Sequence, residues 1–387
     1  MKKRFLAMVL AAAMMLTAMV GCGNGNTQDG GNANNAGATG DTIKIGGLAP
    51  LTGDVSVYGV AVDNGVKMAV EEINADGGVL GKQIEYIVYD EKGDATEAVN
   101  AYNKLVQSDN VVAIIGDVTS KPCKAAKDKI PLITASGTAE NITQAGENIF
   151  RACFIDPFQG QLMASYAKEK LGATTAAIIY DNGDDYSTGI ADAFEEKAGE
   201  IGLTITAKEA YPSKSVDFKS QLTKIKAGNP DVLLVPVYYS DVALIAVQAK
   251  ELGIEAQFLG ADGWDGVIGQ VDESNMDAVN GAYFCSQYSA QSDDPNLQAF
   301  LSKYKETYGM DASQFAVLGY DAMKMLAQAI SEAGSTDSAA ITSAMAAIDF
   351  TGLTGHMTFD ENRNPVKSAA ITQIDNGEYK FIEYYEK

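Results

Sequence analysis

Residues 116–143 (GDVTSKPCKAAKDKIPLITASGTAENIT) contain small hydroxyl residues at two places, each of them shortly after an apolar run. The runs at 111–115 and 131–134 predict buried strands of a parallel sheet, and Ser120, Ser136 and Thr138 come directly after them. Loops after successive parallel strands emerge at the same carboxyl edge of a sheet, where α/β proteins bind ligands. Hydroxyls and free backbone N–H groups at such an edge can hold a small polar or anionic group. The stretch contains no nucleophile–base pair.

Aromatic and acidic residues occupy the matching positions in the second half of the chain. Tyr186 follows a predicted strand at 176–181, Tyr238 ends one at 232–239, and Asp262 ends one at 256–262. Trp264, the only tryptophan, comes two residues later. Together with the hydroxyls of the first half, these residues predict a site with one carboxylate, several hydroxyls and an aromatic wall. A zwitterion with an apolar side chain suits that set of groups.

Several motifs that would indicate an enzyme or a metal protein fail on spacing. Residues 77–82 (GGVLGK) place three residues between the glycines where a phosphate-binding loop needs four, so they predict a turn. Residues 181–185 (DNGDD) begin like a calcium loop, but Tyr186 stands where that loop requires glycine. The single histidine, His356, is predicted to lie in a loop near the carboxyl end. We therefore expect no enzyme activity, no cofactor and no metal.

Composition indicates a large, acidic binding protein. The chain has 387 residues, 46% of them hydrophobic, and a formal net charge of −22. That length predicts two domains. The sequence has no large basic region of the kind that binds nucleic acid, which argues against nucleic acid as a partner. The acidic balance fits a soluble, monomeric surface.

The amino terminus resembles a bacterial lipoprotein signal. Lys2, Lys3 and Arg4 precede an apolar segment at 5–20, and the segment closes with Gly21 just before Cys22. Residues 1–22 are thus a predicted signal peptide whose cysteine becomes lipidated, with an ordinary secretory signal as the alternative. Residues 23–41 are rich in Gly, Asn and Ala and predict a flexible tether.

Three further cysteines remain, Cys123, Cys153 and Cys285. An odd number leaves at least one unpaired within the chain. Their spacing fits no metal site, and we expect buried free thiols, with one disulfide as the alternative.

Strands and helices alternate from residue 41 onward. Helical spacing at 60–74, 95–108, 158–171, 187–201, 217–227 and 240–252 separates apolar strand-like runs, and helices at 295–308 and 313–333 follow. Two βαβ series of similar size, joined by short extended crossings near residue 156, predict an α/β fold with two doubly wound lobes and a cleft between them.

The chain resembles the leucine/isoleucine/valine-binding proteins, the substrate-binding receptors of branched-chain amino acid ABC transporters. The likeness covers 41–387 and includes LTGDVSVYGVAVDNGVKMAVEEINADGGVLGKQIE, IIGDVTS, PLITASGTAENIT, YDNGDDYSTGIADAFEE, PVYYSDVALIAVQAKELGI and FLGADGWDG. It implies a type I periplasmic binding fold, with two Rossmann-like lobes joined by three hinge segments. The implied lobes are 42–156 with about 286–356, and 157–285 with about 357–387.

The resemblance also implies roles for individual residues. Ser120 would bind the ligand α-carboxylate, and Ser136 and Thr138 would offer a carbonyl to the ammonium and a hydroxyl and N–H to the ligand. Tyr238 would reach the carboxylate from the other lobe, and Asp262 would pair with the ammonium, where a compared family member has Glu. The aromatic positions lining the cleft would be Tyr58 and Tyr186, with Trp264 bordering the side-chain pocket.

The implied function is an extracytoplasmic, lipid-anchored receptor that closes over an apolar amino acid and delivers it to a membrane permease. Relatives that bind amides, aromatic acids or purine-like compounds leave those ligands as alternatives, and a sensory ligand-binding domain is a further one. One departure concerns residues 120–130 (SKPCKAAKDKI), which are about two helical turns shorter than in related receptors. The helix after Ser120 should therefore be stunted, and Ser120 could be displaced relative to Thr138.

Overall fold

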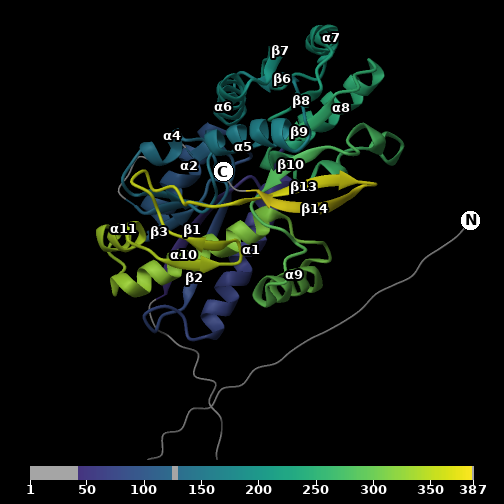
Figure 1. The fold of residues 1–387 in the computed structure, drawn as a ribbon. Helices are drawn as coiled ribbons and strands as arrows, with labels where there is room; N and C mark the ends of the chain where they lie inside the picture. Colours follow the sequence, from purple (N-terminus) through teal and green to yellow (C-terminus); the bar gives the residue numbers. More distant parts are fainter. Residues whose placement is uncertain (1–41, 124–129, 386–387) are drawn as a thin grey trace, which may run out of the picture. The chain divides into compact units, whose positions relative to one another are not determined.

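The computed structural model describes residues 42–123 and 130–385 (Figure 1). The predicted signal peptide, Cys22 and the tether at 23–41 lie outside the described residues. Those that are described all belong to one compact unit, Gly40–Lys387. Both main sheets lie within this unit.

The first half of the chain forms a five-stranded parallel sheet in the order β2-β1-β3-β4-β5. Its strands are β1 (Ile43–Ala49), β2 (Ile84–Asp90), β3 (Ala113–Ile115), β4 (Leu132–Thr134) and β5 (Ile149–Arg151). The three central strands β1, β3 and β4 are almost entirely buried, as expected for strands covered by helices on both faces. The loops after β3 and β4 consequently lie side by side at one edge.

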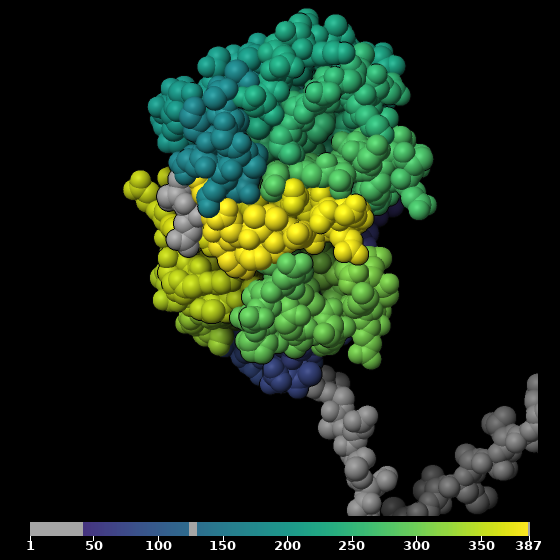
Figure 2. Space-filling model, turned by 45° about the vertical axis from the view of Figure 1, so that its right-hand side comes forward, coloured from purple at the N-terminus to yellow at the C-terminus, as the bar shows by residue number. Residues whose placement is uncertain are grey.

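The second half forms a seven-stranded sheet in the order β14-β13-β10-β9-β8-β6-β7. Its strands are β6 (Thr175–Asp181), β7 (Thr204–Tyr211), β8 (Val232–Leu234), β9 (Gln257–Gly260), β10 (Tyr283–Ser286), β13 (Ala369–Asp375) and β14 (Glu378–Tyr385). The last two strands are antiparallel additions, and β13 pairs with β10. Figure 2 shows this carboxyl-terminal segment, in yellow, lying against the teal and green segments that carry the rest of the sheet.

Helices cover both sheets. They are α1 (Ser56–Ala75), α2 (Ala95–Lys104), α3 (Ser120–Cys123), α4 (Asn141–Gln144), α5 (Asp156–Glu169), α6 (Asp185–Ile201), α7 (Lys219–Gly228), α8 (Tyr239–Glu251), α9 (Pro295–Tyr308), α10 (Gln314–Ala333) and α11 (Ser338–Ala346). The closest helix pairs are α1 with α10 and α5 with α6. Glycine permits this approach: a Cβ on Gly65 would lie 1.9 Å from the Ala316 carbonyl oxygen, and one on Gly160 would lie 2.4 Å from that of Ile190.

The predicted elements match the observed ones in type but differ at some ends. The helix expected at 95–108 stops at Lys104 and continues as a π-helical turn, Leu105–Asp109, which ends at Asn110 in the left-handed conformation. The prediction of a loop for His356 was wrong, because this residue lies in the short strand β12 (Gly355–Met357), paired with β11 (Phe350–Gly352). Its ring lies 2.8 Å from the Asp349 carboxylate.

The three described cysteines agree with the sequence prediction. Cys123, Cys153 and Cys285 are buried free thiols, which confirms that interpretation over a disulfide. Among the described residues, no helix is both long and apolar enough to cross a membrane.

Candidate ligand-binding site

One small cavity gathers residues from both sheets. It is lined by Tyr58, Val118, Thr119, Ser120, Ser136, Thr138, Tyr186, Tyr238, Asp262, Gly263 and Phe315. These come from the loops after β3 and β4 on one side, the starts of α6 and α8 and the end of β9 on the other, and the first turns of α1 and α10. All the sequence-predicted site residues except Trp264 and Cys22 therefore meet here. The cavity volume is about 10 Å³, roughly the room of one water molecule.

The two hydroxyl-bearing loops of the first sheet are bonded to each other. Ser136 Oγ donates to the Val118 carbonyl at 2.7 Å, and the Ala139 N–H donates to Ser120 Oγ at 3.1 Å. The helix that begins at Ser120, α3, is described as far as Cys123, and the next six residues of the predicted short helix lie outside the described residues. Ser120 and Thr138 nevertheless line the same cavity, because these cross-loop hydrogen bonds hold the loops together.

Arg151, at the end of β5, forms hydrogen bonds with the loop after β4. Its guanidinium is fully buried and donates to the carbonyls of Gly137 at 3.0 Å and Ala139 at 2.8 Å, and to Thr143 Oγ1 at 3.3 Å. Sequence reasoning missed this residue. The signal available was an arginine inside the apolar run IFRACF, which a buried strand tolerates only if the charge is well hydrogen-bonded.

Asp262 is the only acidic residue among the described residues that line the cavity. It is 2% exposed, and its Oδ1 accepts a hydrogen bond of 2.9 Å from the Tyr186 hydroxyl, which in turn accepts from the Gly263 N–H at 2.9 Å. No lysine or arginine of the described part of the chain forms an ion pair with it. Burial raises the pKa of Asp262 to about 7. A buried carboxylate without a countercharge is well suited to receive an ammonium group.

Aromatic rings form the rest of the wall. Tyr186 and Tyr238 stack with ring centroids 4.8 Å apart, and Tyr58 stacks on Phe315 at 4.1 Å. The Tyr238 hydroxyl is buried, and it interacts with the Asp184 carboxylate, which lowers the pKa of Asp184 against the larger effect of burial. Because no geometrically close hydrogen bond to the described residues holds it, this hydroxyl can also turn to a ligand. Phe315, in the first turn of α10, was not predicted.

Trp264 does not line the cavity. Its side chain is fully buried, and its indole Nε1 donates to the Val235 carbonyl at 2.7 Å. The 3-10 turn Asp262–Trp264 directs Asp262 to the cavity and the indole into the core. The expectation that Trp264 borders a ligand pocket is therefore not met by this arrangement.

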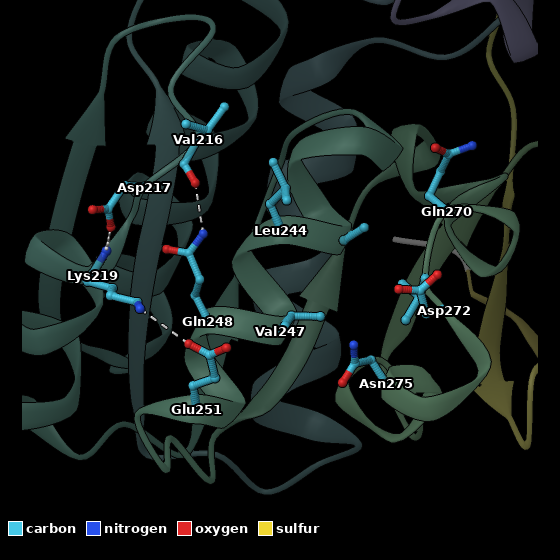
Figure 3. Close-up of a pocket in the computed structure, with 12 residues that line it drawn as sticks. Val216, Asp217, Lys219, Leu244, Val247, Gln248, Glu251, Gln270, Asp272 and Asn275 are labelled. Atoms are coloured by element: carbon cyan, nitrogen blue, oxygen red, sulfur yellow. Dashed lines mark hydrogen bonds and ion pairs between the residues drawn. The ribbon is translucent and has the colours of Figure 1, made fainter.

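A larger groove, of about 420 Å³, lies elsewhere on the second half of the chain (Figure 3). It runs between the start of α7, the outer face of α8 and the segment 270–275, and Figure 3 shows its side chains spread along an open surface. Some of its polar groups already pair with each other, such as Lys219 with Glu251 at 3.3 Å and Gln248 with the Val216 carbonyl at 2.9 Å. None of the sequence-predicted site residues lines it. The small cavity, with convergent buried polar groups, is the better candidate.

The cavity residues do not form a nucleophilic or metal site. The hydroxyls there have no histidine, lysine or cysteine among the described lining residues to act as a base. In the described ranges 42–123 and 130–385 no cluster of three or more His, Cys, Asp or Glu side chains could hold a metal ion. The chemistry that this arrangement supports is binding of a small polar molecule with both charge signs.

Comparison with known proteins agrees with this interpretation. The profile of the family described as "Periplasmic binding protein" matches residues 42–378. A leucine-, isoleucine-, valine-, threonine- and alanine-binding protein of Pseudomonas aeruginosa is 30% identical over 331 residues, which cover 83% of this chain and 86% of that protein.

Two solved structures share the fold closely. A leucine-binding protein from Thermotoga maritima is 33% identical, with a TM-score of 0.82 and coverage of 89% of this chain and 98% of that one. A branched-chain amino acid transporter substrate-binding protein from Streptococcus pneumoniae, solved with isoleucine, is 34% identical, with a TM-score of 0.83 and coverage of 89% and 99%. The two-lobed α/β fold expected from the sequence is thereby confirmed, and this chain belongs to the periplasmic binding protein family that includes the Leu/Ile/Val-binding proteins of branched-chain amino acid transporters.

Proposed function

We propose that this protein is an extracytoplasmic receptor that binds an apolar, branched-chain amino acid in the cavity between its lobes and delivers it to the permease of an ABC importer. The observation that carries the proposal is Asp262, a buried carboxylate with no ion-pair partner among the described residues, in a cavity lined mainly by hydroxyls and aromatic rings. The relatives of this chain that are described above are solute-binding proteins and not enzymes.

Each charge of a zwitterion has a suitable partner in this cavity. Asp262 pairs with the α-ammonium, and the Ser136 and Thr138 loop adds backbone carbonyls. The α-carboxylate is bound by Ser120 and the N–H groups of its loop, and by the Tyr238 hydroxyl from the other lobe. Such charge-assisted hydrogen bonds offset the cost of dehydrating both charges. The rings of Tyr58, Tyr186 and Phe315 enclose an apolar side chain.

Binding requires the lobes to separate and close again. A cavity of about 10 Å³ does not hold an amino acid with its walls as they stand. Because both lobes contribute contacts, the ligand has higher affinity for the closed state and shifts the population toward it. We assign the lobes to 42–156 with about 286–356, and to 157–285 with about 357–387. In support, α10 packs against α1, β3 and β4 of the first sheet, while β13 and β14 join the second.

The family is one of periplasmic binding proteins, so the chain acts outside the cytoplasm. We further propose that residues 1–22 are a lipoprotein signal, that Cys22 carries the lipid, and that 23–41 tether a monomeric receptor to the outer face of the cell membrane. Support comes from the charged start, the apolar segment and the Gly–Cys junction of the sequence.

Ligands without an α-ammonium, such as aromatic acids, amides or purine-like compounds, fit this cavity less well. They would leave the Asp262 carboxylate buried and unpaired, which costs several kcal/mol unless it stays protonated. A sensory role for the same fold remains an alternative that ligand binding alone would not separate from transport.

A thermal-shift screen tests the proposal. The purified protein is heated with each natural amino acid, small amides, aromatic acids and nucleobases, alongside the Asp262→Ala variant and Asp272→Asn, an exposed control in the following segment. A ligand present at a hundred times its dissociation constant should add about 2.7 kcal/mol of stability. We expect shifts with leucine, isoleucine or valine that Asp262→Ala abolishes and Asp272→Asn retains. Shifts only with acids or amides, unchanged in Asp262→Ala, would replace the amino acid by another ligand class.

A further inference from the structure

Gln159 lies directly behind Asp262 without lining the cavity. It is in the first turn of α5, fully buried, and its Oε1 accepts the Asp262 N–H at 2.9 Å and the Cys285 thiol at 3.2 Å. Its Nε2 donates to Asp156 Oδ1 at 3.3 Å. Both the oxygen and the nitrogen of the Gln159 carboxamide are thus hydrogen-bonded to buried polar groups. The oxygen fixes the main chain of Asp262, whose carboxylate faces the cavity.

Asp156 extends this connection to the other side of the site. It is 1% exposed, and its main-chain N–H donates to the Thr138 carbonyl at 3.0 Å. Its Oδ2 is buried without a hydrogen-bond partner among the described residues. Hydrogen bonds and the short backbone from Asp156 to Gln159 therefore join Thr138, a residue of the first-sheet loop, to Asp262 on the second sheet.

We propose that Gln159 and Asp156 are positioning residues for amino-acid binding, which hold the Asp262 carboxylate at a fixed place relative to the Thr138 loop so that both contact one α-ammonium. This inference deepens the proposed function and rests on it. Neither residue lines the cavity, so their effect is on the positions of the groups that do.

The charges around these residues support the assignment. Burial raises the pKa of Asp156 well above its usual range, which favours the uncharged acid and so reduces its repulsion of Asp262. Burial raises the pKa of Asp262 to about 7, and the Gln159 side chain, separately from its bond to the Asp262 main chain, acts in the opposite direction and lowers it. The titratable groups whose charges couple to Asp262 are Tyr58, Cys153, Asp156, Tyr186, Tyr238, Asp265 and Cys285.

The affinity for an amino acid should depend on the ionisation of Asp262. An ammonium binds the charged form of Asp262, so affinity is full above the pKa of the free protein and falls as pH drops below it. Removing the Gln159 carboxamide should raise that pKa and move the midpoint of the affinity profile to higher pH. A residue that only fills space would change affinity equally at every pH and leave the midpoint where it is.

The test is calorimetric titration of L-leucine, L-isoleucine and L-valine into the purified protein and its Gln159→Met variant between pH 5.5 and 8.5. Gln161→Met, exposed on the same helix, is the matched control. For Gln159→Met we expect an affinity loss of about tenfold or more at pH 7.5 and a midpoint raised by about 0.5–1 pH unit. An unchanged affinity, or a uniform loss with an unchanged midpoint, would overturn the proposal.

A pair of substitutions at Asp156 keeps the test decisive should Gln159→Met not fold. Asp156→Asn keeps an oxygen acceptor for Gln159 and should bind within about threefold of the unmodified protein, whereas Asp156→Leu removes the acceptor and should lose about tenfold. Equal affinities for the two variants would contradict the inference. If the unmodified protein binds none of the three amino acids, the proposed function itself is wrong, which is a separate result.

Discussion

The hydroxyl of Tyr58 lies 2.5 Å from the carbonyl oxygen of Gly263, a residue 205 positions away in the sequence. The same hydroxyl accepts a hydrogen bond of 3.1 Å from the Tyr239 N–H. Tyr58 is on α1, which packs with the first sheet, whereas Gly263 and Tyr239 follow strands of the second. One side chain thus bonds two backbone groups that follow strands of the other sheet.

Tyr58→Phe should therefore weaken the closed state without removing the ring that contacts Phe315. The Gly263 carbonyl and the Tyr239 N–H would lose their partner, which costs about 1–2 kcal/mol in closure. We expect ligand dissociation to become about 5- to 30-fold faster with little change in association, measured by stopped-flow fluorescence of Trp264. Tyr384→Phe, 49% exposed, is the control. Unchanged dissociation would show that this contact does not hold the lobes closed.

Asp262→Asn should stabilise the unliganded protein at alkaline pH. The folded-state pKa of about 7 lies above the ordinary value of 3.8, so the native protein retains a proton that the unfolded chain releases between those values. The unfavourable contribution is absent below the unfolded pKa and complete above pH 7. We expect a gain on the order of 3 kcal/mol in urea unfolding at pH 8, shrinking toward pH 5.

The opposite dependence in sign or an equal gain at both pH values would contradict the burial argument for Asp262. Asp272→Asn, an exposed substitution on the same connecting segment, should leave the unfolding free energy within about 0.5 kcal/mol of the unmodified protein.

The affinity of the unmodified protein for its amino acid should depend on pH. Because ammonium binding requires the charged carboxylate, the dissociation constant should be constant above about pH 7, where the pKa of Asp262 lies, and rise by up to about tenfold per unit below it. Calorimetry in two buffers of different ionisation enthalpy would also detect proton release at pH 6. A profile flat from pH 5.5 to 8.5 would argue against pairing with Asp262.

Arg151→Met should damage both stability and binding. It removes the guanidinium hydrogen bonds to the Gly137 and Ala139 carbonyls and to the Thr143 hydroxyl, which costs on the order of 3 kcal/mol in total. The two carbonyls keep only the Cys153 thiol and the Ile142 N–H as donors. Urea unfolding without ligand measures this cost, and calorimetry measures the affinity lost as the Thr138 loop loosens. Lys219→Met, which breaks one exposed ion pair, should cost less than about 1 kcal/mol. A similar effect for both variants would rule out a special role for Arg151.

The fold and most of the cavity could be predicted from the sequence because parallel sheets impose a simple rule. Once 111–115 and 131–134 are recognised as neighbouring strands, Ser120 and Thr138 must emerge at one edge, and they line one cavity. The same rule places Tyr238 and Asp262 together. The apolar runs that mark the strands, and the positions at which they end, are enough to predict that these residues lie close together.

That rule does not predict the positions of the Trp264, Phe315 and Gln159 side chains. The direction of the Trp264 side chain depends on the 3-10 turn after β9, which no alternation pattern specifies. Phe315 reaches the cavity only because α10 packs on α1, a contact between distant segments. Gln159 acts through partners more than a hundred residues away, such as Asp262. Contacts of this kind depend on tertiary packing rather than on local sequence.

The central claim, that Asp262 pairs with the ligand ammonium, is tested most directly by one calorimetric comparison. L-leucine and 4-methylpentanoate, which has the same side chain and carboxylate but no ammonium, are titrated at pH 7.5 into the unmodified protein and into Asp262→Asn. We predict that the unmodified protein prefers L-leucine, and that Asp262→Asn loses about a hundredfold or more in affinity for it but not for the acid. Equal binding of L-leucine by both proteins would contradict the account.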